Sequence, residues 1–276
     1  MLAKDYLTDS LSQLGREDAS EIIEAYLHVS AADRPETIDE IYYRMLESGQ
    51  SGERKAGVIG GAIGGVRKLG PILCDFEPAL VLEKYSSGRE VFENIMVQLH
   101  PRGNINHTAK GMWPMYCRTI LSGAKFLSQF ASAKDFYDWV DFFDEDERAR
   151  PALPMLVAQE IYGFGFALAC DFLKELGYEN FSKPDVQIKY IFPALGLCPY
   201  GAGDYEVFKA IARVARNAGV TPYNVDKLFW LIGSGNFYDD GHIGKNGRIG
   251  SRKKEFIALA RPALENKRPE ETRRYA

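Results

Sequence analysis

Apolar side chains recur every three or four residues over much of the chain, which is the spacing of one face of an α-helix. The spacing is clear in segments 18–31 and 37–47. It returns in 112–130, after a turn expected at Pro114. No segment alternates apolar and polar residues with a period of two, as a half-buried strand does, and no internal repeat occurs. The pattern therefore predicts an all-α fold.

Capping residues predict two further helices on either side of residue 220. Asp204 and Gly219 are suited to begin and end a helix over 203–218. Thr221 and Pro222 then offer a cap residue followed by proline, which is typical of a helix start. The chain is therefore expected to remain helical here.

The chain has 276 residues and a mass of 31.0 kDa, a length that suits two lobes better than one compact domain. With 46% hydrophobic and 26% charged residues, its composition is that of a folded protein. The longest apolar run, 56–66, is shorter than a membrane span, and the N-terminal residues lack the pattern of a secretion signal. We therefore expect a cytoplasmic monomer without a membrane partner.

The net charge of −4 is distributed unevenly along the chain. Residues 1–50 carry four Lys or Arg against eleven Asp or Glu, whereas residues 242–276 carry ten against four. A basic C-terminal region can meet a phosphate backbone, and it can equally be a solvated helix and tail. The four cysteines form no CxxC pair, so we expect neither a metal site nor a disulfide framework.

Two glycine-rich segments offer backbone N–H groups to a ligand. The segment 57–70 lacks the Lys-Ser/Thr ending of a phosphate-binding loop, and close packing between helices explains its glycines as well. The segment 241–250 is expected to form a mobile loop, whose Lys245 and Arg248 can contact phosphate.

The segment 153–177 predicts a helical hairpin. One helix leads to a turn at residues 162–165, and a second helix begins at Phe166. Gly163 and Gly165 permit the tight turn and leave N–H groups bare of side chains, where the helix dipole favours a phosphate. A hairpin that only packs is the alternative interpretation.

This hairpin resembles that of the helix-hairpin-helix superfamily of base-excision DNA glycosylases. The family pattern is an apolar helix, then Gly-apolar-Gly, then a second helix with a small residue. This chain has Gly163, Phe164, Gly165 and Ala169 at those places. A Pro-Asp segment follows in the family and here lies in 183–189, before an Ala-Leu-Gly-Leu ending at 194–197. The match is good over roughly 150–200 and looser in the helices on either side.

The resemblance implies that Asp185 is the catalytic carboxylate, which stabilises positive charge on the sugar while the glycosidic bond breaks. The alternative role of Asp185 is that of a helix N-cap after proline. The hairpin would hold the DNA backbone, and the resemblance permits a Na⁺ or K⁺ at its carbonyls and no other cofactor. The expected DNA-binding residues are Gly163, Phe164, Gly165, Ala167, Lys189, Lys245 and Arg248.

Bifunctional members of the family carry a lysine two residues after the second hairpin glycine, and this chain has Ala167 there. The chain therefore resembles the monofunctional branch, which includes the alkylpurine (3-methyladenine) glycosylases. The Pro-Asp-x-x-Ile-Lys run of those enzymes is similar to 184–189. The resemblance implies release of the base without lyase activity.

A flipped base is normally held between aromatic or apolar faces. The residues expected to line such a pocket are Trp113, Tyr116, Tyr162, Phe166 and His107. Aromatic residues at helical spacing are more often part of a core, so both interpretations stay open.

Three regions are expected: a helical region of unrecognised type at 1–105, a glycosylase-like core at 106–235 and a basic loop and helix at 236–276. The sequence thus predicts two helical lobes with a helix-hairpin-helix motif between them, acting on double-stranded DNA with a modified base. Base-excision repair and defence against phage DNA with modified bases are both compatible roles. A non-catalytic DNA-binding protein and a scaffold that binds protein are the alternatives.

Overall fold

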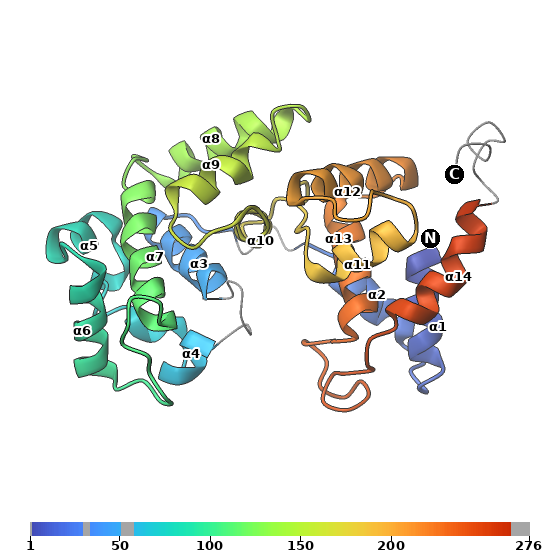
Figure 1. The fold of residues 1–276 in the computed structure, drawn as a ribbon, viewed down its shortest axis with the longest axis horizontal. Helices are drawn as coiled ribbons and strands as arrows, with labels where there is room; N and C mark the ends of the chain where they lie inside the picture. The colour runs from blue at the N-terminus through green and yellow to red at the C-terminus, as the bar shows by residue number, and fades with distance from the viewer. Residues whose placement is uncertain (1, 30–33, 51–57, 266–276) are drawn as a thin grey trace. The chain divides into compact units, whose positions relative to one another are not determined.

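The computed structural model describes residues 2–29, 34–50 and 58–265, and within these ranges it contains helices and no strand (Figure 1). The predicted all-α fold is confirmed. The α-helices are α1 (Leu2–Ser12), α2 (Ala19–Leu27), α3 (Ile38–Gly49), α4 (Val58–Ile63), α5 (Pro78–Lys84), α6 (Gly88–Leu99), α7 (Met112–Leu127), α8 (Ala133–Glu145), α9 (Ala152–Glu160), α10 (Phe166–Glu175), α11 (Val186–Ala194), α12 (Asp204–Ala218), α13 (Pro222–Ser234) and α14 (Lys253–Glu265). Two short 3-10 helices, Val66–Leu69 and Cys74–Phe76, lie between α4 and α5. Within the described ranges, no helix is both long and apolar enough to cross a membrane.

The chain forms two compact units. The first consists of Met1–Ser30 and Ser182–Ala276, and the second of Ala31–Phe181. These bounds differ from the three expected regions, because the N-terminal helices α1 and α2 pack with α13 from the other end of the chain. Figure 1 shows the same arrangement, with the blue N-terminal helices beside the orange and red C-terminal ones.

The core of the first unit is built around α13. Leu231 and Ile232 of this helix are fully buried in one cluster with Leu7 and Leu11 of α1. Thr221 caps α13, since its side chain accepts a hydrogen bond from the Asn224 N–H, as the Thr-Pro pair predicts. Burial of these large apolar side chains stabilises the unit, by about 1.5–3 kcal/mol for each one.

The core of the second unit is built where α3 crosses α7. Tyr42 of α3 donates a hydrogen bond to the Ile120 carbonyl (2.7 Å), and Tyr116 of α7 donates one to the Leu46 carbonyl (2.8 Å). Gly123 lets the helices approach closely, because a Cβ atom there would overlap the end of Met45. These contacts make α7 a fixed platform for the hairpin that follows in the chain.

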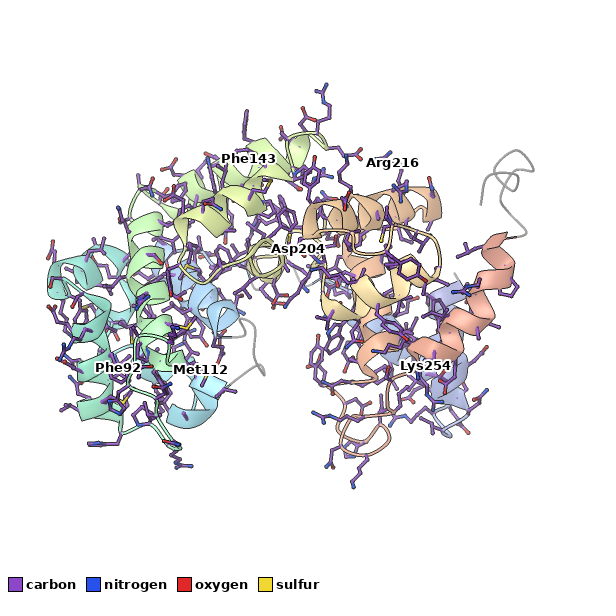
Figure 2. The ribbon with its side chains drawn as sticks, in the orientation of Figure 1. Phe92, Met112, Phe143, Asp204, Arg216 and Lys254 are labelled. Atoms are coloured by element: carbon purple, nitrogen blue, oxygen red, sulfur yellow. The ribbon has the colours of Figure 1, made fainter. Side chains whose placement is uncertain are left out.

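Some local expectations need correction. Helix α7 begins at Met112 (labelled in Figure 2), so Pro114 lies in its first turn rather than in a turn before it. Proline is tolerated there because its missing N–H has no partner within the helix. Helix α12 is capped by Gly203, whose N–H donates to the Glu206 side chain (3.0 Å), and not by Asp204. Of the glycine-rich segment 57–70, the first residue lies outside the described ranges.

Candidate functional site

The predicted hairpin is present in the second unit, formed by α9 and α10. Gly163 has a φ of +80°, a conformation that side chains with a Cβ atom rarely adopt. Gly165 is the N-cap of α10 and has ordinary backbone angles. Phe164, between the two glycines, is only 6% exposed and packs its ring toward Phe172. Phe164 therefore anchors the turn, and its buried ring is not available for a DNA contact.

Three side chains of α7 hold Tyr162 at the start of the turn. The Tyr162 N–H donates to Ser122 Oγ (2.8 Å), and the Tyr162 carbonyl accepts from Thr119 Oγ1 (2.8 Å). Arg118 Nη1 donates to the Tyr162 phenol oxygen (3.0 Å). No sequence motif indicated these three contacts, although Arg118, Thr119 and Ser122 are polar residues at helical spacing in an otherwise apolar helix.

The start of α10 is open on the side of Gly165. Among the described residues, a Cβ atom built at Gly165 would have no heavy atom within 4 Å. No side chain caps this helix. An anion can therefore come close to the backbone here, where the positive end of the helix dipole favours it. Ala167 in the first turn carries a methyl group and supplies no amine.

The hairpin carbonyls give limited support for a bound Na⁺ or K⁺. The Ile161 carbonyl accepts from the Phe164 N–H (3.1 Å), and the Tyr162 carbonyl accepts from Thr119. Both oxygens are thus already engaged, and the cation remains an expectation from the resemblance. In the described ranges, no three His, Cys, Asp or Glu side chains are grouped so as to hold a metal ion.

Asp185 is the N-cap of α11, in the first unit. Its Oδ1 atom accepts hydrogen bonds from the N–H groups of Gln187 and Ile188, each at 2.9 Å. The alternative role expected for Asp185, that of a helix N-cap, is therefore confirmed. Both bonds end on Oδ1, so Oδ2 takes no part in the cap. A capping Asp that uses one oxygen leaves the other for chemistry.

The surroundings of Asp185 make its carboxylate more basic. Burial raises its pKa to about 6, and the negative charge of Asp226 adds to the increase. The two cap hydrogen bonds and the charge of Lys183 act in the opposite direction. Asp226 lies in α13, is 3% exposed and accepts a hydrogen bond from the Lys183 N–H (2.9 Å). Strongly shifted carboxylates of this kind concentrate at functional sites.

Contacts from α13 and α14 fix the first turn of α11. Gly233 of α13 lets the two helices meet, because a Cβ atom there would overlap Gln187. Lys253 Nζ donates to Gln187 Oε1 (3.4 Å) and lies 4.5 Å from the ring centre of Tyr190. Gln187 belongs to the turn that Asp185 caps, so these contacts also fix the position of the Asp185 carboxylate. No sequence motif indicated the roles of Asp226 and Gly233.

The other expected DNA-binding cations also lie in the first unit. Lys189 forms an ion pair with Asp204, so its charge is partly neutralised. Lys245 and Arg248 are exposed on the loop before α14. This loop is anchored rather than open: Ile243 is buried, and the Ile249 N–H donates to the Gly235 carbonyl (2.9 Å).

The expected pocket aromatics differ in exposure. Trp113 and Tyr116 are 2% and 4% exposed and form an edge-to-face pair in the core of the second unit. Tyr162 is 39% exposed, and Phe166 is partly buried. His107 is exposed, with its ring edge-on to Phe92. The more accessible rings are thus those of the hairpin and of the loop before α7.

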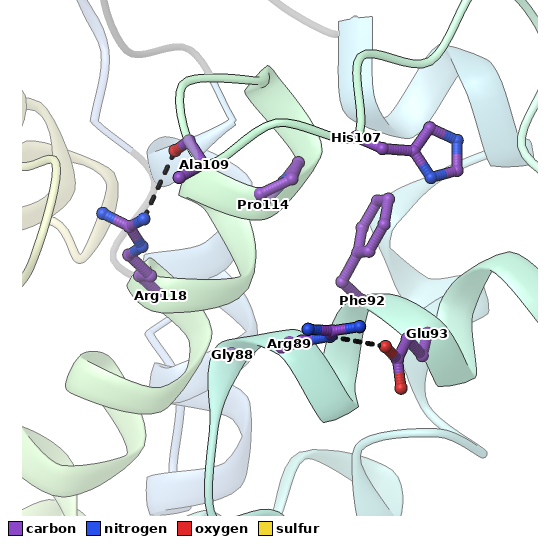
Figure 3. A pocket seen from close by; sticks show the side chains of 8 residues that line it. All are labelled: Gly88, Arg89, Phe92, Glu93, His107, Ala109, Pro114 and Arg118. Atoms are coloured by element: carbon purple, nitrogen blue, oxygen red, sulfur yellow. Dashed lines mark hydrogen bonds and ion pairs between the residues drawn. The ribbon is translucent and has the colours of Figure 1, made fainter.

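Two cavities of the second unit border that loop. One, of about 510 Å³, is lined by His107, Phe92 and Arg118 among others (Figure 3). The other, of about 460 Å³, is lined by Trp113, Arg102 and Lys110 among others. The expected residues Trp113 and His107 therefore face different cavities. Asp185 belongs to the first unit and lines neither.

Comparison with known proteins gives a distant structural likeness. No protein-family model matches the chain, and no curated protein matches it. One similar solved structure is the 8-oxoguanine glycosylase/lyase of Methanocaldococcus jannaschii, in complex with DNA that contains 8-oxoguanine. The TM-score is 0.49 at 14% sequence identity, over 82% of this chain and 96% of that one. A likeness at this level assigns no activity to the chain.

Proposed function

We propose that the protein is a DNA glycosylase that flips a modified base out of double-stranded DNA and hydrolyses its N-glycosidic bond. The observation that carries the proposal is the carboxylate of Asp185. It is partly buried beside a second carboxylate, its pKa is raised to about 6, and one of its oxygens takes no part in the helix cap. The hairpin with an open helix start at Gly165 supports a DNA backbone as the partner.

The proposed mechanism uses Asp185 in its ionised form. As the bond from C1′ to the base nitrogen breaks, the electron pair leaves with the base and positive charge builds on the sugar. The negative charge of Asp185 stabilises this cation, as preorganised charges do in other enzymes. A water oxygen then bonds to C1′ while one of its protons passes to the carboxylate, which releases that proton to the departed base or to solvent. The product is an abasic site. With a pKa near 6, the carboxylate is mostly ionised at neutral pH and still basic enough to take that proton.

The hairpin is proposed to position the DNA backbone while the base is out of the stack. The backbone N–H groups at the start of α10 and the helix dipole would bind a phosphate beside Gly165. The exposed Tyr162 and His107 and the partly buried Phe166 are the proposed contacts of the flipped base. Trp113 and Tyr116 are buried and would act as core residues of the same unit.

We propose hydrolysis rather than lyase chemistry because Ala167 has no amine to form a Schiff base with C1′. Lys183 is the amine nearest to Asp185 in sequence, and its charge acts on that carboxylate. Borohydride reduction tests the assignment. We expect no covalent enzyme–DNA product, whereas a trapped adduct that disappears in Lys183→Gln would show that this lysine acts as the nucleophile.

A panel of duplexes tests the activity itself. Each duplex carries one modified base, such as an alkylated purine, 8-oxoguanine or a glucosylated pyrimidine, and is treated with hot alkali after incubation. We expect one duplex or a small group to be cut only after alkali, at the modified position. The identity of that base would separate a repair role from phage defence. Binding to every duplex without cutting would instead support the non-catalytic alternative.

A further inference from the structure

A long stretch without carboxylates covers α7 and the loop before it. From Asn94 to Lys134 the sequence contains no Asp or Glu, although the chain as a whole is acidic, with 38 such residues and a net charge of −4. The stretch instead contains the cations Arg102, Lys110, Arg118, Lys125 and Lys134. A local surplus of positive charge in an acidic protein calls for a local explanation.

The cations inside this stretch differ from those at its edges in their pairing. Arg89, just before it, pairs with Glu93 (2.7 Å), and Lys134, at its end, pairs with Asp138 (2.6 Å). All other cations of the stretch have exposed side chains and form no ion pair with any described residue: Arg102, Lys110, Arg118 and Lys125. Four uncompensated charges on one segment repel one another, and a polyanion relieves this repulsion.

Arg118 lies between the hairpin and the loop. One guanidinium nitrogen donates to the Tyr162 phenol oxygen (3.0 Å) and another to the Ala109 carbonyl (3.3 Å). Figure 3 shows the guanidinium turned toward Ala109. Both acceptors are neutral, so the positive charge of Arg118 remains available. Lys110 follows Ala109 directly in the chain.

The remaining cations continue from Arg118 in two directions. Lys125 lies seven residues further along α7, which places it on the same helix face two turns away. In the other direction, Lys110 and Arg102 line the same cavity of about 460 Å³. A row of exposed cations thus passes the hairpin at Tyr162.

We propose that Arg102, Lys110, Arg118 and Lys125, here called the α7 surface, bind the phosphates of the DNA backbone as it continues away from the hairpin. The inference rests on the proposed function, which supplies duplex DNA as the partner, and adds where that duplex runs. Evenly spaced phosphates match a row of separate cations. Contacts of this kind position the duplex without reading its sequence.

Binding of an unmodified duplex at several KCl concentrations tests the inference. Arg118→Ala and Lys125→Ala are compared with Lys134→Ala and Arg89→Ala, which remove exposed but paired cations from the same unit. We expect each of the first two variants to bind about three- to tenfold more weakly, whatever the DNA sequence. The slope of log affinity against log salt should decrease by about 1 for each lost phosphate contact. The controls should match the wild type.

Tyr162→Phe separates charge from hairpin geometry, because it removes the hydrogen bond to Arg118 and keeps the cation. We expect Tyr162→Phe to retain the wild-type salt slope; a slope lowered as much as in Arg118→Ala would overturn a direct phosphate contact.

Gly165→Glu tests the contribution of the hairpin to DNA binding separately from that of the α7 surface. If Gly165→Glu weakens binding while Arg118→Ala and Lys125→Ala match the controls, the α7 surface is excluded and the proposed function stands. If the wild type binds no duplex even at low salt, duplex DNA is not its partner, and both the proposed function and the α7 surface are rejected.

Discussion

The helices α10 and α11 begin in two contrasting ways. Asp185 caps α11 with its carboxylate, which accepts hydrogen bonds from two backbone N–H groups. The anion at the start of this helix is therefore a side chain of the protein. Gly165 caps α10 without any side chain and leaves open space around it. The same physical feature, the positive end of a helix, thus holds a fixed carboxylate in one unit and is left open to an external anion in the other. In the proposed function, the first would stabilise the sugar cation and the second would bind a backbone phosphate.

The first prediction concerns stability, because burial makes the ionised form of the Asp185 carboxylate unfavourable in the folded protein. Its folded-state pKa of about 6 lies above the ordinary aspartate value of 3.8, so ionisation destabilises the folded protein as pH rises from about 4 through 6. Asp185→Asn should therefore raise the free energy of unfolding by up to about 3 kcal/mol at pH 7 and by little at pH 4. Asparagine caps a helix as well as aspartate does, so the cap is retained.

Denaturant unfolding at both pH values measures this effect. Asp146→Asn is a control of opposite sign, because the hydrogen bond from Arg148 lowers the pKa of Asp146 to about 2. Its removal should not stabilise the protein at neutral pH. A loss of stability in Asp185→Asn at pH 7 would mean that the ionised carboxylate stabilises the fold, which contradicts a raised pKa.

The second prediction is a pH dependence of base release. Only the ionised form of Asp185 stabilises the sugar cation, so the single-turnover rate should decrease as pH falls through about 6. Below that value the decrease should approach about tenfold per pH unit. Release measured without enzyme at each pH is subtracted, since some modified bases leave faster in acid. A rate that is constant from pH 7 to pH 4.5 would be inconsistent with the ionised carboxylate as the active form.

The third prediction addresses the open helix start. Gly165→Glu should weaken binding to any duplex by about tenfold or more, because a carboxylate would take the place of the phosphate. The fold should tolerate the change, since a Cβ atom there meets nothing and the backbone is unstrained. Gly203→Glu is the matched control: Gly203 is also the N-cap of a helix, with a φ of −71° and open space. Equal affinities of the two variants would leave the hairpin a structural element only.

The smallest expected effect concerns the support of the hairpin by α7. Thr119→Val keeps the shape of the side chain and removes the hydrogen bond to the Tyr162 carbonyl (2.8 Å). We expect a loss of about 1 kcal/mol in unfolding free energy and a modest loss of DNA affinity. Ser128→Ala, which removes an exposed bond to the Lys125 carbonyl at the end of the same helix, should change neither. If Thr119→Val also leaves both unchanged, the turn is fixed by its glycines and by Phe164 alone.

The sequence predicted the parts of the site that depend on local chemistry. The turn at Gly163 requires a positive φ, and Asp185 follows a proline at a helix start, so both are visible in a few neighbouring residues. The burial of Trp113 and the approach of Asp226 to Asp185 depend on helices that are distant in sequence. The pairing of α1 with α13 likewise joins opposite ends of the chain, and no local pattern encodes it.

The most direct test of the account is single-turnover base release by Asp185→Asn, on whichever duplex the wild type cuts after alkali. DNA binding is measured on the same samples. We predict wild-type affinity and a rate at least about a thousandfold lower, since the variant keeps the cap and loses the charge that stabilises the sugar cation. A folded variant that binds DNA normally and releases the base within tenfold of the wild-type rate would remove Asp185 from the mechanism and contradict the account.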